Sequence, residues 1–279
     1  SMTGPGCPWQ GDGFFLPSQD LINAYRTDAD GLPVFDYQSL PDYATVAFAG
    51  DGSYSLANAD GTVDPRLDFV TGRPTIRYKT YPDSPCGLWV RNSDVYGYNN
   101  TKRFWLSPES PAATQGWPWG ASALNWQIIR YADLLLYKAE ALIEIGGEGL
   151  EQARTLINRV RDRARNSAFV KDFNNPEQNA ANYKIGLYPA TGWTQDYARR
   201  ALRTEMRLEK AMEGERFFDL VRWGIAKETM NNYFRAESDN RIYYQNATFD
   251  SGEEYFPVPV AQYNFSGGIY VQNPGYPAF

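Results

Sequence analysis

The spacing of apolar residues divides the chain into two regions that meet near residue 122. In residues 1–122, glycine, proline, asparagine and aspartate recur every few positions, and the apolar runs between them are short. Such interrupted patterns predict loops and short strands. The one helix that this region suggests is a short one from Pro17 to Ala24.

From residue 123 the apolar residues follow a helical spacing instead. They are Ile128, Ala132, Leu135, Leu136, Ala139, Leu142 and Ile143, and the glycines at 146 and 147 end the pattern. A second helical pattern begins after a few residues and contains Ala153, Leu156, Ile157, Val160 and Ala164. Because the connection between the two patterns is short, they predict an antiparallel helix hairpin.

A polar, asparagine-rich segment, residues 166–193, separates this hairpin from a second one. It predicts a long excursion, and long loops on rigid scaffolds often carry function. The second hairpin is expected over residues 194–214 and 215–234, with Thr194 as its N-cap, and the tail from Arg235 returns to turns. The sequence thus predicts a loop-rich region at 1–122 and a helical region at 123–279.

The composition is that of a folded protein, and it excludes several functions. Of the 279 residues, 43% are apolar and 22% are charged, and none is histidine. The lack of histidine excludes catalysis and zinc binding by imidazole. A net charge of −6 argues against a nucleic-acid-binding protein. No stretch approaches 18 consecutive apolar residues, and the first ten residues lack the pattern of an export signal. Cys7 and Cys86 allow one disulfide, and their spacing leaves open whether they pair.

Three glutamates, Glu205, Glu209 and Glu213, stand four residues apart and therefore line one face of a helix. One interpretation is a general acid and base pair. We favour a structural network, because arginine side chains are interleaved with the glutamates and planar guanidinium groups satisfy buried carboxylates well. The expected members are Arg203, Arg207, Arg216 and Arg222, with Asn158, Arg161 and Arg163 from the preceding hairpin.

Acidic turns in the first region offer oxygen ligands of the kind that calcium accepts. They lie around Asp28, Asp30, Asp60 and Asp64. Their spacing does not match a calcium-binding loop, so turn formation is the better explanation, and we predict no metal-ligating residue.

Aromatic residues make up 15% of the chain, and many of them fall in residues 86–126. They do not follow a helical spacing, and a loop cannot bury all of them. Flat aromatic faces beside amide and charged groups suit a sugar ring, although single rings commonly anchor a loop on its scaffold. We expect at least one exposed platform, formed from Trp117 or Trp119 and from Tyr96 or Tyr98, flanked by Arg91, Asn92, Asn99 and Asn100, with Trp89 as a further candidate.

Several motifs, in a consistent order along the chain, resemble the SusD/RagB family. They are DGLP (30–33), DPRLD (64–68), IIRYADLLLYKAEALIEIG (128–146), ARTLINRVRDRAR (153–165), EMRLEKAMEGERFFDLVRWG (205–224), YFPVP (255–259) and QNPGY (272–276). Because they extend over most of residues 12–276, the resemblance is far more specific than a single short pattern.

The resemblance implies a mainly α fold, with tetratricopeptide-like helix pairs, long loop-rich excursions and few short strands. It implies an outer-membrane lipoprotein on the cell surface that binds glycans or other nutrients and delivers them to a SusC-like TonB-dependent transporter. It implies neither catalytic activity nor a cofactor. The glutamate and arginine positions would belong to the helical scaffold. The ligand-binding residues of the family lie in variable loops, so none can be transferred by position.

The resemblance covers the C-terminal half of the family, whose members have a further N-terminal portion that carries the lipidated cysteine and more helix pairs. A helix pair in a repeat scaffold buries its faces on its neighbours, so this chain should expose apolar surface. Two explanations stay open: the chain is a truncated or proteolysed piece of a longer protein, or it associates with the missing portion as a partner.

Two other functions remain open at this point. A glycoside hydrolase needs two carboxylates across a cleft, for which Asp94 and Glu109 are the candidates in the aromatic segment. A protein- or peptide-binding scaffold would expose its aromatics on the helices instead of the loops.

Overall fold

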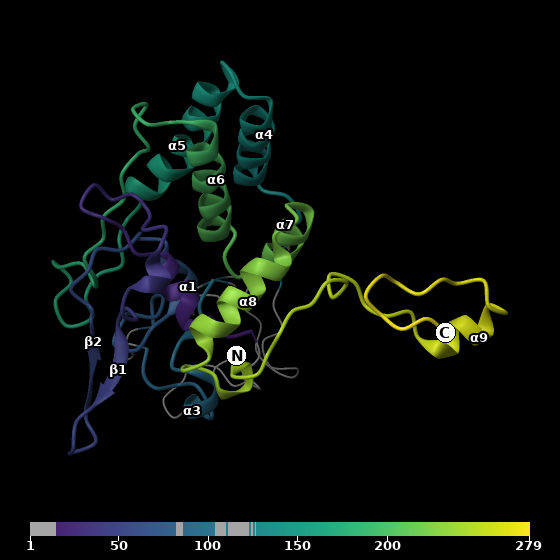
Figure 1. Cartoon of the computed structure of the whole chain (residues 1–279). Coiled ribbons are helices and arrows are strands. Elements are labelled where there is room, and N and C mark those ends of the chain that lie inside the picture. Colours follow the sequence, from purple (N-terminus) through teal and green to yellow (C-terminus); the bar gives the residue numbers. More distant parts are fainter. Residues whose placement is uncertain (1–14, 82–85, 104–109, 111–122, 124, 126) are drawn as a thin grey trace. The chain divides into compact units, whose positions relative to one another are not determined.

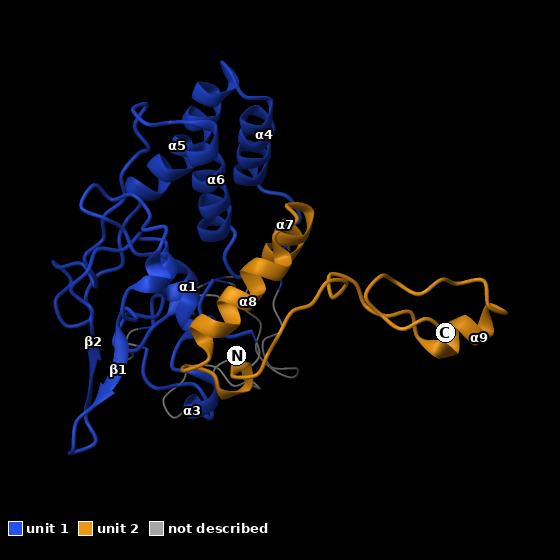
Figure 2. Cartoon of the chain, in the orientation of Figure 1, with its two compact units in different colours: residues 1–213 blue, residues 214–279 orange. Residues whose placement is uncertain are grey.

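The computed structural model describes residues 15–81, 86–103, 110, 123, 125 and 127–279. The chain forms two compact units, residues 1–213 and residues 214–279 (Figure 2). Unit 1 contains α1 (Gln19–Ala24), a 3₁₀ turn at Tyr37–Ser39, β1 (Thr45–Phe48), β2 (Tyr54–Ala57), α2 (Leu67–Val70), β3 (Thr71–Gly72), α3 (Ser93–Tyr96), β4 (Asn100–Thr101), α4 (Tyr131–Ile145), α5 (Gly149–Arg165) and α6 (Gln195–Glu209). Unit 2 contains α7 (Arg216–Arg222), α8 (Ala226–Glu237), a 3₁₀ turn at Ile242–Tyr244 and α9 (Val260–Phe265). The fold is mainly helical with few short strands, as expected.

Three helices, α4, α5 and α6, lie side by side and form the largest helical layer of unit 1 (Figure 1). The hairpin expected from the apolar spacing is present as α4 and α5. Its first helix begins at Tyr131 instead of near residue 123, because Arg130 provides the N-cap and the side chain of Asp133 accepts a hydrogen bond from the Arg130 backbone N–H. The apolar faces of the three helices meet in a buried layer that includes Leu136, Ala139, Ile143, Ala153, Ile157, Val160, Ala198, Leu202 and Met206.

Capping side chains begin two helices of unit 1, and Thr194 is the one that the sequence predicts. The Thr194 side chain accepts a hydrogen bond from the backbone N–H of Tyr197 and so begins α6. Ser18 caps α1 in the same way, by accepting from the N–H of Leu21. Each cap satisfies one of the amide groups that a helix N-terminus leaves without a partner.

Residues between 22 and 70 of the first region pack on the end of α6 and the turn after it. One buried cluster joins residues of α1 and the following loops to Leu208 and Ala211, and it contains Ile22, Ala24, Tyr25, Tyr43, Ala44, Val63, Leu67 and Val70. The hydroxyl of Tyr25 donates to the backbone oxygen of Leu208 at 2.8 Å. The change in pattern near residue 122 is thus a change of secondary structure within one compact unit. The boundary between the two units falls at 213/214 instead.

Two small antiparallel ladders provide the strands of unit 1. In the β1–β2 hairpin, Val46 pairs with Leu56 and Phe48 pairs with Tyr54. In the second ladder, Thr71 of β3 pairs with Thr101 of β4. The backbone N–H groups of Lys102 and Arg103 also donate to the Val70 oxygen, so the chain after β4 is fixed to α2.

The long excursion over residues 166–193 contains neither helix nor strand, as predicted, yet it is fixed to the core. At its centre the backbone of Gly186 lies against that of Gly31. A Cβ atom on Gly31 would come within 2.5 Å of the Gly186 nitrogen, and Gly31 has a φ of +77°. The buried guanidinium of Arg161 bridges this contact, since it donates to the backbone oxygens of both glycines. The glycine of the DGLP motif is therefore required by a close backbone approach.

The predicted second hairpin differs from the structure. The segment expected to be one helix over 215–234 is two helices, α7 and α8, separated near Gly224, whose φ of +69° is incompatible with a continuous helix. Leu220, Ala226 and Phe249 form a buried cluster within unit 2. In unit 1, α6 instead packs with α4 and α5.

One face of α4 is not covered by the described residues of unit 1. Tyr131, Leu134, Ala141 and Ile145, which lie at a spacing of about one or two turns, are exposed, with Tyr137 beside them. We call these five residues the α4 stripe. It confirms the expectation that the chain exposes apolar helix surface. Among the described residues, no helix has the length and apolar character needed to cross a membrane.

Candidate functional site

The loop that carries most of the predicted ligand residues precedes β4. Arg91 and Asn92 are exposed at its start, and Asn92 adopts a left-handed backbone conformation that leads into α3. Tyr96 ends this short helix with 39% of its surface exposed, and Tyr98 follows Gly97 in a half-buried position. The loop therefore presents two tyrosines, a guanidinium and an amide on its outer surface.

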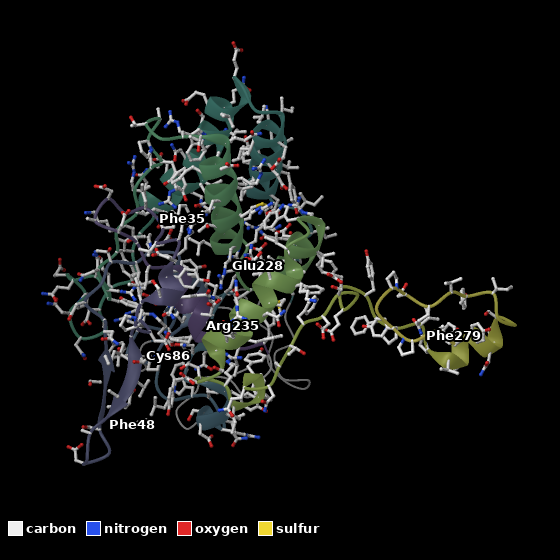
Figure 3. All side chains as sticks on the ribbon, viewed as in Figure 1. Phe35, Phe48, Cys86, Glu228, Arg235 and Phe279 are labelled. Atoms are coloured by element: carbon white, nitrogen blue, oxygen red, sulfur yellow. The ribbon has the colours of Figure 1, made fainter. Side chains whose placement is uncertain are left out.

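Tyr98 meets the β1–β2 hairpin and forms an aromatic surface with it. Phe48 lies edge-to-face against Tyr98 with 6.0 Å between ring centroids, and the tilted ring of its strand partner Tyr54 lies 6.3 Å from it. Phe48 is 55% exposed, and Figure 3 shows it on the hairpin. We call Phe48, Tyr54 and Tyr98 the hairpin aromatic surface.

The hairpin aromatic surface can make both apolar and polar contacts. Edge-to-face rings leave ring faces open for an apolar ligand surface. Burial, and then the neighbouring Cys86, raise the pKa of Tyr54, so its hydroxyl remains protonated and able to donate. Phe48 and Tyr54 were not predicted as site residues. The signal that could have identified them is their position on either side of the turn AGDGS, because aromatics beside a tight hairpin turn become strand neighbours.

Three of the predicted ligand residues lie in the core, which corrects the expectation for them. Trp89 is 3% exposed and packs edge-to-face on Tyr78, with 5.4 Å between centroids. Asn100 is fully buried in β4, and its amide lies 3.7 Å from the sulfur of Cys86. Asn99 is also buried and donates to Gln19. These three residues anchor the loop in the core. For Trp89 this is the alternative to ligand binding that applies to an aromatic residue in a loop.

Four residues named in the sequence predictions lie outside the described residues. They are Trp117 and Trp119 of the expected platform, Glu109 of the hydrolase alternative and Cys7 of the possible disulfide. Asp94, the other hydrolase candidate, is exposed on α3.

A second cluster of polar side chains surrounds the glutamates of α6. Glu205, fully buried, accepts from Arg66 at 2.6 Å and from Arg161 at 3.0 Å. Glu209, also buried, accepts from Arg66, Arg130 and Arg163, with distances of 3.1, 3.0 and 2.6 Å. Glu213 pairs with Arg103 and Arg130. We call these three glutamates and five arginines the glutamate–arginine network.

The network confirms the structural interpretation of the glutamates, but most of its cations differ from those expected. Arg161 and Arg163 are members, as predicted. The other three arginines come from the DPRLD motif, from the residue after Lys102 and from the N-cap of α4. Arg207, which lies on α6 itself, points away and pairs with Asp20 at 2.5 Å. In unit 2, Arg222 pairs with Asp219.

The electrostatics of the network suit a structural role. Burial by itself would raise the pKa of Glu209, but the surrounding guanidinium groups of Arg66, Arg163 and Arg130 lower it to about 2. For the buried Asp64, burial is likewise outweighed by Arg66, so its pKa is lowered. Carboxylates held in the ionised form with every oxygen occupied make poor general acids.

The acidic turns are explained by local hydrogen bonds. The Asp28 carboxylate accepts from the backbone N–H groups of Asp30 and Leu32, which is an Asx turn. Asp64 accepts from its near neighbour Arg66. Within the described ranges no group of three or more aspartate, glutamate or cysteine side chains is arranged to hold a metal ion.

Comparison with known proteins agrees with the resemblance seen in the motifs. The sequence profile of the SusD family matches residues 3–276, which is nearly the whole chain. SusD-like protein P2 of Formosa agariphila is 29% identical over 92% of the chain, and SusD-like protein P38 of the same organism is 37% identical over 38% of it. The chain spans 51% of the length of the first relative, so it matches about half of that protein.

A solved structure of a SusD homolog agrees with this result for the fold. The crystal structure of a SusD homolog from Bacteroides thetaiotaomicron superposes on 76% of the chain with a TM-score of 0.53 at 24% sequence identity, and the match covers 41% of that homolog. Surface glycan-binding protein A from the same organism gives a TM-score of 0.44 at 18% identity, over 96% of this chain and 56% of that one.

Proposed function

This chain belongs to the SusD family, and on that premise we propose that it takes part in non-catalytic glycan binding at the bacterial cell surface. The observation that carries the proposal is the hairpin aromatic surface, where an exposed phenylalanine and two tyrosines lie beside a loop with an exposed guanidinium and amide. A sugar ring has an apolar C–H face and a rim of hydroxyl groups, so it needs this combination of flat rings and planar hydrogen-bonding groups.

Within this site the residues have different roles. The rings of Phe48 and Tyr98 contact the apolar face of a sugar unit. Arg91 and Asn92 at the start of the loop are the expected partners of its hydroxyl groups, and Tyr96 is a further exposed ring. Trp117 and Trp119 stay proposed members of the platform. Since few groups contribute, affinity is expected on the order of micromolar to millimolar.

For the full-length protein, we propose the role that the family implies. It would be anchored by a lipid at the outer membrane and would pass its glycan to a SusC-like TonB-dependent transporter. The α4 stripe is the surface on which the additional helices of longer family members would pack, since it is the apolar helix face that unit 1 leaves uncovered.

Affinity gel electrophoresis against a panel of plant, host and microbial polysaccharides tests the glycan proposal. The double variant Phe48→Ala, Tyr98→Ala should weaken the best ligand about tenfold or more, since each ring contact contributes roughly 0.5–1.5 kcal/mol. Phe256→Ala is the matched control, because Phe256 is a 90% exposed aromatic in unit 2. If the polysaccharide slows the migration of the double variant as much as that of the Phe256→Ala control, the assigned surface is contradicted. If neither the wild type nor the variants bind any polysaccharide, the glycan function is contradicted. Release of shortened sugars would favour the hydrolase alternative.

A further inference from the structure

A pocket of about 240 Å³ lies in unit 1 beside the glutamate–arginine network. Its wall is formed chiefly by Arg66, Phe69, Arg103, Arg130, Arg163 and Glu209. It therefore presents four guanidinium groups and one carboxylate. Pockets for drug-sized ligands measure about 300–1,000 Å³, so this one has room for a single small ring and not for a long chain.

The four arginines of the pocket differ in how many of their N–H donors are already used in hydrogen bonds within the protein. Arg66 donates to Asp64 and to two glutamates of the network. Arg130 donates to Glu209 and Glu213, as does Arg103. Towards the described residues, Arg163 donates through one nitrogen, from Nη2 to Glu209 at 2.6 Å, and its side chain is 56% exposed. A guanidinium group has five N–H donors, so most of those on Arg163 remain available to a ligand.

The lining of the pocket carries four arginines and one glutamate, although the chain as a whole has a net charge of −6. Ion pairs connect these arginines to nearby carboxylates, and the exposed Arg163 makes one such pair, with Glu209.

An apolar surface lies next to the available guanidinium. Phe69, on α2, is 45% exposed and lines the same pocket. Phe69 and Arg163 together match a sugar that carries an acidic group. The phenyl ring can contact the C–H face of the sugar, and the planar guanidinium can donate to two oxygens of the acidic group.

We propose that this pocket binds the anionic group of an acidic sugar unit, a carboxylate or a sulfate ester, through Arg163, with Phe69 against the sugar ring. The inference rests on the proposed glycan-binding function and adds a ligand class to it, namely acidic polysaccharides. It uses a surface that shares no residue with the hairpin aromatic surface, so separate variants distinguish a failure of one site from a failure of the other.

Titration of the 279-residue chain at low salt, followed by isothermal calorimetry and amide NMR shifts, tests the inference. The probes are glucuronic acid, glucose 6-sulfate, glucose and inorganic sulfate. We expect at least one acidic sugar to bind fivefold or more tightly than glucose and inorganic sulfate. Arg163→Gln should weaken that binding at least fivefold. Arg163→Lys should also weaken it, because lysine keeps the charge but lacks the planar fork.

Arg165→Gln is the matched control. Arg165 lies two residues further along α5, is similarly exposed and pairs with Asp162 instead of lining the pocket. Equal losses in the Arg163 and Arg165 variants would show unspecific charge attraction and overturn the inference, as would the absence of binding by any acidic sugar. Inorganic sulfate that binds as tightly as both acidic sugars would mean a simple anion site and would overturn the sugar assignment. The Phe48→Ala, Tyr98→Ala variant should bind the acidic sugar normally, and circular dichroism checks that each variant folds.

Discussion

The substitution Glu209→Gln tests whether the glutamate–arginine network stabilises unit 1. Glutamine keeps the shape of the side chain but removes the charge that three guanidinium groups share. The variant leaves the largely buried Arg66 and Arg130 beside a neutral side chain. Removing one partner of a buried ion pair is costly, because the remaining charge is no longer compensated. We therefore expect a large loss of unfolding free energy.

The size of the loss follows from the pKa of Glu209. Its value of about 2 lies some 2.5 units below the ordinary 4.5. Since one unit corresponds to about 1.4 kcal/mol, the ionised carboxylate stabilises the folded chain by roughly 3 kcal/mol at neutral pH. That contribution is fully present above pH 4.5, because the folded-state pKa is the lower one, and it is lost as the pH falls from 4.5 towards 2.

Urea titrations followed by far-ultraviolet circular dichroism at pH 7 and at pH 3 measure the effect. The gap between wild type and Glu209→Gln should be roughly 3 kcal/mol at pH 7 and clearly smaller at pH 3. Glu151→Gln serves as control, because Glu151 is an exposed carboxylate that pairs with Arg154 on the surface of α5, and no measurable change is expected for it. A loss below 1 kcal/mol at pH 7, or a gap that is independent of pH, would refute the reasoning.

Two further substitutions address other parts of unit 1. Burial lowers the pKa of Lys102 to about 8, so its protonated form opposes folding below that pH. The wild-type unfolding free energy should gain roughly 3 kcal/mol between pH 8 and 10.5, and urea titrations of Lys102→Met should lack this gain; parallel pH curves would contradict the assignment. Gly31→Ala should cost about 2 kcal/mol or more, because a Cβ at a φ of +77° would meet the backbone of Gly186 and separate the oxygens that Arg161 bridges. Thermal unfolding measures it, with Gly147→Ala, also at positive φ but with open space around it, as the control for φ alone.

The helices of the scaffold could be predicted because their signals are local. Apolar spacing identifies α4 and α5, and the side chain of Thr194 marks the start of α6 three residues before the amide that it caps. The break between α7 and α8 was missed because the apolar spacing continues through Gly224, and only the left-handed backbone at that residue separates the two helices.

The ion-pair partners of α6 could be predicted only in part, because they come from distant positions. Four-residue spacing shows that Glu205, Glu209 and Glu213 share a face, but nothing in that spacing identifies Arg66 or Arg103, which lie more than 100 residues earlier. The arginines nearest in sequence were the wrong choice for the same reason: Arg207 lies on the same helix but on another face, where it pairs with Asp20.

The residues of the candidate site could likewise be predicted only in part from the sequence. Tyr98 and Trp89 occupy the same loop and have the same aromatic character, yet one lies at the surface and the other in the core. Their difference depends on Tyr78 and Cys86, which pack on Trp89, and on Phe48, which reaches Tyr98 from a hairpin 50 residues away. Composition indicates that a segment has aromatics to present, and tertiary contacts decide which of them are presented.

The network and the hairpin aromatic surface are connected through the chain between them. Arg66, held by two glutamates of α6, immediately precedes α2, and α2 leads into β3. β3 pairs with β4, which ends the loop that carries Tyr98. The DPRLD motif and the β3–β4 ladder thus fix both ends of this loop. A rigid base of this kind would hold the rings of the loop in position before a sugar binds, which lowers the ordering cost of binding.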